Sequence, residues 1–216
     1  MIEADFPLLS LTMIVPLLGA ILAGSIRNID FSKQVAFFIA VLSLLLTICV
    51  LILFDANKAE FQLVERYSWI SILNIEYLIG VDGISVLFLP MTALLTLITM
   101  MASWNTISHS SRFHFSLLLA LEGVSIGIFC ALDTVLFFLF WELTLPPFFF
   151  LIGLWGIGSQ RRSAAMKYTL FMLSGGVTLL LAIIVLATNH AIQSGGQIPN
   201  DLSFSLPVLL NTTLPL

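Results

Sequence analysis

The sequence predicts an all-α protein that crosses a membrane six times, and three observations support this fold class. Hydrophobic residues make up 59% of the 216 residues and charged residues only 9%, a composition that no water-soluble globular domain matches. Six apolar runs each approach the ~20 residues that a membrane-spanning helix needs. Basic residues gather in alternate loops between these runs, which is typical of proteins that pass repeatedly through a membrane.

The six apolar runs divide the chain into predicted helices and connecting loops. Each run is long enough to cross a hydrocarbon core about 30 Å thick. The final segment, 189–216, contains several Gly, Pro and Asn residues and is predicted to be an extramembrane tail of a single membrane domain, 1–216. The predicted helices lie approximately at 7–26, 35–54, 84–103, 113–131, 133–156 and 164–188.

The loops differ in charge, and this difference predicts the orientation. Because cytoplasmic loops carry an excess of Lys and Arg, the loops after the first, third and fifth helices are predicted to be cytoplasmic, with the N-terminus outside. Glu3 and Asp5 precede the first helix, where a signal peptide would carry basic residues, so we expect this helix to be retained. Six of the eight basic residues support the orientation: Arg27, Lys33, Arg112, Arg161, Arg162 and Lys167.

The connection at 55–82 is the longest loop between predicted helices, and it is acidic. Apolar and polar residues alternate in FQLVERYSWI and in NIEYLI, a pattern typical of strands. We therefore expect a short hairpin or an interfacial strand pair on the outer face.

Several function classes are excluded by what the sequence does not contain. No basic patch indicates nucleic-acid binding. His109, His114 and His190 show no metal-ligand spacing, so no metal site is predicted. Cys49 and Cys130 both lie in apolar runs, where packed and inert thiols are expected, so no redox chemistry is predicted for this chain.

The fifth predicted helix, 133–156, carries an ionisable residue near its middle. An ionised side chain at this depth costs about 3 kcal/mol on insertion scales, so Glu142 indicates a site on an ion or proton path. Pro146 and Pro147 follow, and since proline has no N–H they leave the carbonyls of Glu142 and Leu143 without helical partners. In lipid these carbonyls need water or polar neighbours, so we expect a kink and a hydrated pocket beside Glu142.

A second carboxylate, Glu122, lies at the same predicted depth in the preceding helix. The tight turn at 131–133 makes the two helices antiparallel neighbours, and Glu122 and Glu142 each lie ten residues from Leu132. At 1.5 Å per residue, each is about 15 Å from the turn, which is half the hydrocarbon thickness. If the two carboxylates face a common cavity, they form a proton relay. Alternatively, one of the two acids, Glu142 or Glu122, stays protonated and only hydrogen-bonds a neighbouring helix.

Two further features of these helices have explanations in anchoring and packing. Lys167 lies at the cytoplasmic end of the sixth helix, where its long stem can reach the lipid headgroups. Its depth differs from that of Glu142 by many ångströms, so an interface anchor is preferred to an auxiliary role in the relay. Gly123 and Gly127 form a G-x-x-x-G pattern beside Glu122, which close helix packing explains.

Three stretches resemble subunit M of respiratory complex I, which is called chain 4 in mitochondria. They are GVDGISVLFLPMTALLTLITMMASW at 80–104, LDTVLFFLFWELTLPPFFFLIGLWG at 132–156 and RRSAAMKYTLFMLSGG at 161–176. The resemblance extends over essentially all of the chain in helix order, and the FWE-x-x-L-x-P core followed by GLWG is its most specific part. GVDGIS favours subunit M over related subunits of sodium/proton antiporters and membrane-bound hydrogenases.

The resemblance implies that the six helices correspond to helices 1–6 of the fourteen-helix antiporter-like fold, which contains two inverted repeats. It also implies a proton-translocating membrane subunit of NADH:quinone oxidoreductase, in which the glutamate matching Glu142 is essential. The family pairs this glutamate with a lysine in a seventh helix. That helix is not in this sequence, so we expect an N-terminal fragment from a truncated or split gene.

The resemblance further implies partners, cofactors and location. Other membrane subunits of complex I and the lipid bilayer are the expected partners. NADH, FMN, iron–sulfur clusters and quinone would belong to other parts of the parent complex, with none of them in this chain. A bacterial inner (plasma) membrane is expected in preference to a mitochondrial inner membrane. Two alternatives remain open: a subunit of a sodium/proton antiporter or membrane-bound hydrogenase that uses the same glutamate, and an inactive structural fragment.

Overall fold

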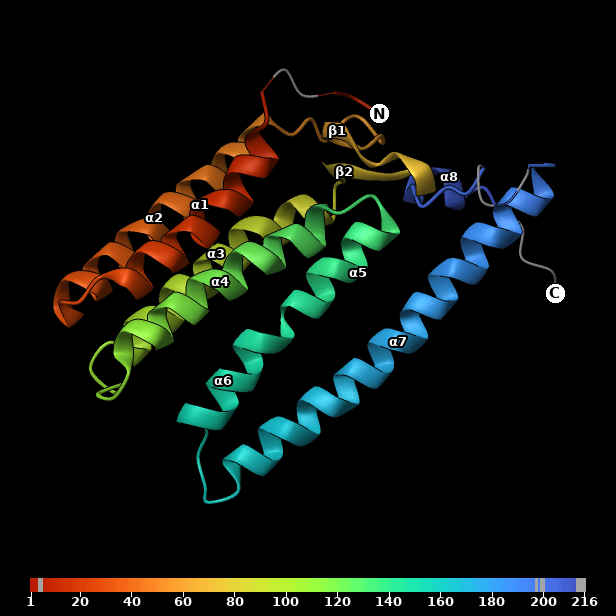
Figure 1. Ribbon diagram of the computed structural model, residues 1–216. Helices are drawn as coiled ribbons and strands as arrows, with labels where there is room; N and C mark the ends of the chain where they lie inside the picture. Colours follow the sequence, from red (N-terminus) through yellow and green to blue (C-terminus); the bar gives the residue numbers. More distant parts are fainter. Residues whose placement is uncertain (4–5, 197, 199–200, 213–216) are drawn as a thin grey trace.

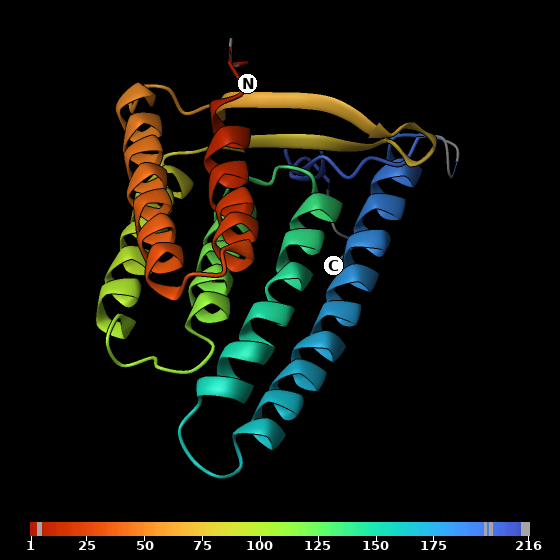
Figure 2. The same ribbon diagram turned by 60° about the vertical axis from the view of Figure 1, so that its left-hand side comes forward.

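The computed structural model consists of helices that run side by side, with a short β-hairpin lying across one end (Figures 1 and 2). It describes residues 1–3, 6–196, 198 and 201–212, so Asp5 and the last four residues of the predicted tail lie outside the described residues. Six helical segments in the described part are long and apolar enough to cross a membrane, which confirms the predicted fold class.

The first four helices pack together, and we call them the four-helix block. They are α1 (Leu8–Ser25), α2 (Ile29–Leu53), α3 (Ser85–Ser103) and α4 (Ser111–Cys130). Close packing of α4 depends on the two predicted glycines. A Cβ at Gly123 would meet the carbonyl oxygen of Met13 and the side chain of Leu17 on α1. A Cβ at Gly127 would meet the ring of Phe140, which lies on the next helix.

The remaining long helices form a second unit, which we call the wing. The fifth span consists of α5 (Thr134–Leu143) and α6 (Leu145–Trp155), and the sixth is α7 (Arg161–Gln193). The wing contacts the block through α4, and α7 contacts α5 and α6. At 33 residues, α7 is about 50 Å long and extends past both ends of the predicted 164–188 span. His190, in its last turn, lies 2.8 Å from the Thr212 hydroxyl of the tail.

One end of the molecule is closed by the β-layer. Strand β1 (Gln62–Ile70) pairs antiparallel with β2 (Ile75–Val81), with the 3-10 helix η1 (Ser71–Leu73) between them, and this confirms the predicted hairpin. The turn between α4 and α5 lies beside β2, because Leu132 N–H donates to Leu78 O over 2.9 Å. On its other side, Leu206 N–H donates to Leu132 O over 2.7 Å. The tail, with its short helix α8 (Leu206–Leu209), therefore folds onto this layer.

Acidic side chains accept hydrogen bonds at the N-terminal ends of helices, and basic side chains donate them at the C-terminal ends. At the β-layer end, Glu65, Asp82 and Asp133 accept hydrogen bonds from backbone N–H groups at the starts of α1, α3 and α5. At the opposite end, Lys33 donates to the carbonyl that follows α3 and Arg112 donates to the carbonyl that follows α1. Because a helix carries partial positive charge at its N-terminus and partial negative charge at its C-terminus, both arrangements are favourable.

Candidate functional site

The predicted kink near Glu142 is a break between two helices, visible between α5 and α6 in Figure 1. Thr144 separates the helices, and its N–H and hydroxyl donate to the same carbonyl, that of Trp141, over 3.2 and 2.7 Å. Pro146 and Pro147 lie in the first turn of α6, where a missing N–H has no intrahelical partner to lose. The prolines therefore lie at the start of a new helix, which begins at Leu145, three residues after the glutamate.

Glu142 is partly buried between α5 and α7, in what we call the α5–α7 seam. A Cβ at Gly176 of α7 would collide with Glu142 Oε1, so the glycine leaves the space that the carboxylate occupies. Among the described residues, Oε1 is buried and has no hydrogen-bond partner. Since a buried carboxylate oxygen without a partner is costly, this arrangement favours contact of Oε1 with water.

Glu122 lies within the four-helix block and is 1% exposed. Neither of its carboxylate oxygens has a hydrogen-bond partner among the described residues, although the Ser43 hydroxyl of α2 lies close enough to interact. Glu122 is eight residues before the end of α4 and Glu142 eight residues after the start of α5. Both therefore lie about 12 Å from the β-layer end of their helices. Their depths match, but Glu122 approaches α2 and Glu142 approaches α7.

Lys167 is exposed in the second turn of α7. It precedes Gly176, the residue in contact with Glu142, by nine residues, which is about 13.5 Å along the helix. In the described part of the chain, no ion pair joins Lys167 to Glu142 or to Glu122. This position suits a headgroup anchor better than a direct partner of the glutamates.

Asp133, at the start of α5, was not a predicted site residue. It is 1% exposed, and its Oδ1 accepts from the N–H groups of Val135 and Leu136 over 2.9 and 3.1 Å. Its Oδ2 accepts from Glu76 N–H over 3.2 Å. Burial raises the pKa of this carboxyl above its usual value, against the opposing effect of the three backbone donors. The sequence signal that could have identified Asp133 is its position directly before an apolar run, which is typical of a residue that caps the start of a helix.

A cavity of about 240 Å³ adjoins Asp133 at the β-layer end of the wing. Its wall contains one ionisable side chain, the Asp133 carboxyl, among mainly apolar groups from α5, α7 and the tail. The described lining residues are Ala131, Asp133, Thr134, Phe137, Leu179, Ile183 and Leu206.

A polar cluster joins α1 to the hairpin and was also missed by the sequence analysis. The buried Glu65 carboxylate of β1 accepts from Leu9 N–H over 2.7 Å and from the N–H and hydroxyl of Ser10. The Ser10 hydroxyl lies 2.7 Å from the Tyr77 hydroxyl of β2. This cluster satisfies the first N–H groups of α1, so its role is to hold the hairpin on the block.

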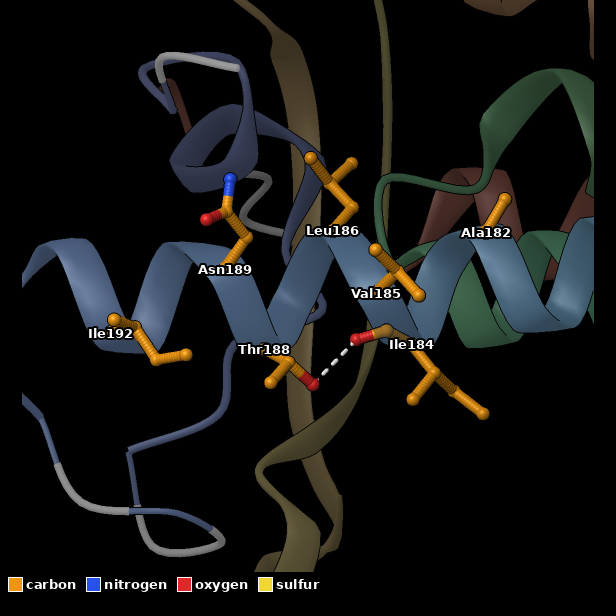
Figure 3. Close-up of a pocket in the computed structure, with 7 residues that line it drawn as sticks. All are labelled: Ala182, Ile184, Val185, Leu186, Thr188, Asn189 and Ile192. Carbon is orange, nitrogen blue, oxygen red and sulfur yellow. Dashed lines mark hydrogen bonds between the residues drawn. The ribbon is translucent and has the colours of Figure 1, made fainter. Parts of the chain in front are cut away.

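A groove of about 790 Å³ runs along α7 near its C-terminal end. Figure 3 shows the side chains that line it. The wall is mainly apolar, and the Thr188 hydroxyl in it donates to Ile184 O over 2.7 Å. The described lining residues are Ala182, Ile184, Val185, Leu186, Thr188, Asn189 and Ile192. With no ionisable side chain among them, this groove is not a candidate for proton chemistry.

Sequence comparisons place residues 131–198 in a match to the family described as NADH:quinone oxidoreductase/Mrp antiporter, TM. NADH-quinone oxidoreductase subunit M of Rickettsia typhi is 36% identical over 188 residues, which cover 83% of this chain and 38% of the relative. NAD(P)H-quinone oxidoreductase chain 4 of Prochlorococcus marinus is 32% identical over 203 residues, which cover 92% of this chain and 37% of that relative. The chain thus spans about two fifths of the length of these relatives.

Solved structures share the fold. A chain of respiratory complex I from Thermus thermophilus with bound NADH superposes with a TM-score of 0.77 at 22% identity, over 96% of this chain and 40% of that one. A chain of the Mrp complex from Dietzia sp. superposes with a TM-score of 0.70 at 20% identity. The superposition covers 88% of this chain and 20% of that one. At these identities the likeness concerns the arrangement of the helices.

Proposed function

From the confirmed resemblance to the antiporter-like membrane subunits of complex I, we propose that this chain is a proton-translocating subunit of an NADH:quinone oxidoreductase. The observation that supports this most directly is the position of Glu142. Its carboxylate lies at mid-span, at a helix break, with a buried oxygen that has no hydrogen-bond partner in the described part of the chain. A carboxyl group in such a place can bind and release a proton without breaking an ion pair.

In this proposal Glu142 carries the proton and Glu122 is a second proton-binding group at equal depth. Pro146 and Pro147 maintain the break beside Glu142, and Lys167 is an auxiliary residue that anchors α7 at the membrane surface. NADH, FMN, iron–sulfur clusters and quinone are bound by other subunits. Electron transfer there changes the proton affinity of Glu142, so that a proton enters from one side and leaves toward the other.

The resemblance and the six apolar helices make the chain a multi-pass membrane protein. We propose a bacterial inner membrane, with the N-terminus and the β-layer outside. The basic side chains at the opposite end, among them Lys33 and Arg112, support this orientation because cytoplasmic ends retain positive charge. Other membrane subunits of the complex are the proposed partners.

The test is NADH-driven proton pumping in inverted membrane vesicles from cells that produce the chain with Glu142→Gln. We expect pumping to fall by about tenfold or more, since loss of a proton-transferring group typically costs 10²–10⁴-fold. Glu60→Gln is the matched control, because Glu60 is exposed and pairs with the N-terminal ammonium. Complex assembly is followed on native gels. If the Glu142→Gln complex assembles and pumps fully, Glu142 is not needed for pumping. The chain would then have only a structural role.

A sodium/proton antiporter subunit is the second candidate, favoured by the shared fold with the Mrp complex. The same vesicles separate the two functions. A proton pump forms its gradient equally well when sodium is absent, whereas an antiporter needs sodium on the opposite side. Dependence of the Glu142-linked flux on sodium would therefore replace the first proposal by the second.

A further inference from the structure

Asp133 lies at the start of α5 and Glu142 lies near the end of the same helix. Both adjoin the space between α5 and α7. Asp133 precedes Glu142 by nine residues, which is about 13.5 Å along the helix axis. The cavity beside Asp133 is bounded by Leu179 and Ile183 on α7. Leu179 lies three residues, or about 4.5 Å, beyond Gly176, the residue in contact with Glu142. The cavity thus begins about one helical turn from the Glu142 carboxylate and ends at the β-layer.

The two oxygens of Asp133 have different surroundings. Oδ1 accepts both hydrogen bonds that cap α5, and these hold the side chain in place. Among the described residues, Oδ2 accepts one longer bond, 3.2 Å from Glu76 N, so it retains capacity for another proton or donor. The Glu76 carboxylate is bonded to Arg66 on the hairpin surface, over 2.8 Å for each of two contacts. Asp133 is therefore the carboxylate that adjoins the cavity, while Glu76 is paired at the surface.

We propose that Asp133 is the proton-release residue of the Glu142 path, accepting at Oδ2 the proton that Glu142 gives up and passing it to solvent beyond the β-layer. Each transfer breaks one O–H bond and forms another, so Glu142 and Asp133 both return to their starting states. The cavity of about 240 Å³ has room for several water molecules of about 30 Å³ each, and these would carry the proton over the part of the distance that lies next to Asp133. This inference rests on the proposed function of Glu142.

The test compares Asp133→Asn and Asp133→Ser with wild type in the assembled complex. Both replacements keep a good N-cap acceptor, so α5 should still begin correctly, but neither can accept the proton. We expect NADH-driven pumping to fall by about tenfold or more in both, with assembly and thermal stability retained. Asp82→Asn is the matched control, because Asp82 caps α3 in the same way and lies outside the wing. Asp133→Glu, which restores a titratable group, should recover part of the pumping.

The outcomes separate this inference from the proposed function. If Glu142→Gln abolishes pumping while Asp133→Asn and Asp133→Ser leave it unchanged, Asp133 is only a cap and the inference is wrong. If Glu142→Gln also leaves pumping unchanged, the proposed function itself fails. Should the Asp133 variants not assemble, infrared difference spectra of the wild-type complex decide the question. An NADH-dependent carboxyl band must then shift when aspartate carries a ¹³C-labelled side-chain carboxyl, and a band without that shift contradicts the inference.

Discussion

The four-helix block and the wing each hold one glutamate at the same depth, in very different surroundings. In the apolar stretch of α4, 61% of residues are buried, whereas in α7 only 17% are. Glu122 lies inside the block, where Gly123 brings α4 against the backbone of α1. Glu142 lies in the wing, at a break in the fifth span and against Gly176 of α7.

This difference in packing gives two chemically identical side chains different access to water. A carboxyl enclosed by tightly packed helices exchanges protons slowly, because water can reach it only if the packing opens. A carboxyl in a seam between two helices needs only local movement at the break. We therefore expect substitutions in the wing to change transport first and substitutions in the block to change stability first.

The largest expected effect comes from filling the space of the Glu142 carboxylate. Gly176→Ala introduces a Cβ where Oε1 lies, so the carboxylate must move and pumping should fall by about tenfold or more, since misplacement by about 1 Å can cost 10²-fold. Gly175→Ala is the control, because a Cβ there meets nothing within 4 Å. Equal pumping by the two variants in membrane vesicles would show that the seam does not constrain Glu142.

Glu122 offers an intermediate effect that sharpens the comparison. Because its oxygens have no hydrogen-bond partner among the residues that the structure describes, Glu122→Met should leave thermal stability in detergent unchanged or raise it by about 1 kcal/mol. Under the proposed role of Glu122 as a second proton-binding group, this variant should also lower pumping, by a smaller factor than Glu142→Gln. Full pumping by Glu122→Met would remove Glu122 from the relay and leave it as part of the block.

The smallest expected effect concerns the bond between the block and the β-layer. Glu65→Ala leaves the first N–H groups of α1 without their acceptor, which should lower the free energy of unfolding by about 0.5–2 kcal/mol. Hydrogen exchange should increase in the first turn of α1 and remain unchanged in α7. Increased hydrogen exchange in α7 would contradict the separation of block and wing. Glu60→Gln again serves as the control.

Much of the architecture could be predicted because it depends on local composition. The six spans follow from apolar runs of the required length, and the hairpin follows from alternation in two segments of the 55–82 loop. Pro146 and Pro147 indicated an interruption of the fifth span. The extent of α7 was underestimated, because its last turn contains Asn189 and His190, which are polar but remain helical where the tail packs beside them.

The amino-acid sequence by itself determined the number of membrane-spanning segments, the matched depth of Glu122 and Glu142, and the location of the break, since these depend on counting residues along one axis. The tertiary structure decided which neighbour each carboxyl contacts, Gly176 for Glu142 and Ser43 for Glu122. It also decided that Asp133 joins α5 to β2. A helix that is apolar all round carries no signal for its rotation about its own axis. The facing of its few polar side chains is therefore set only when the helices pack.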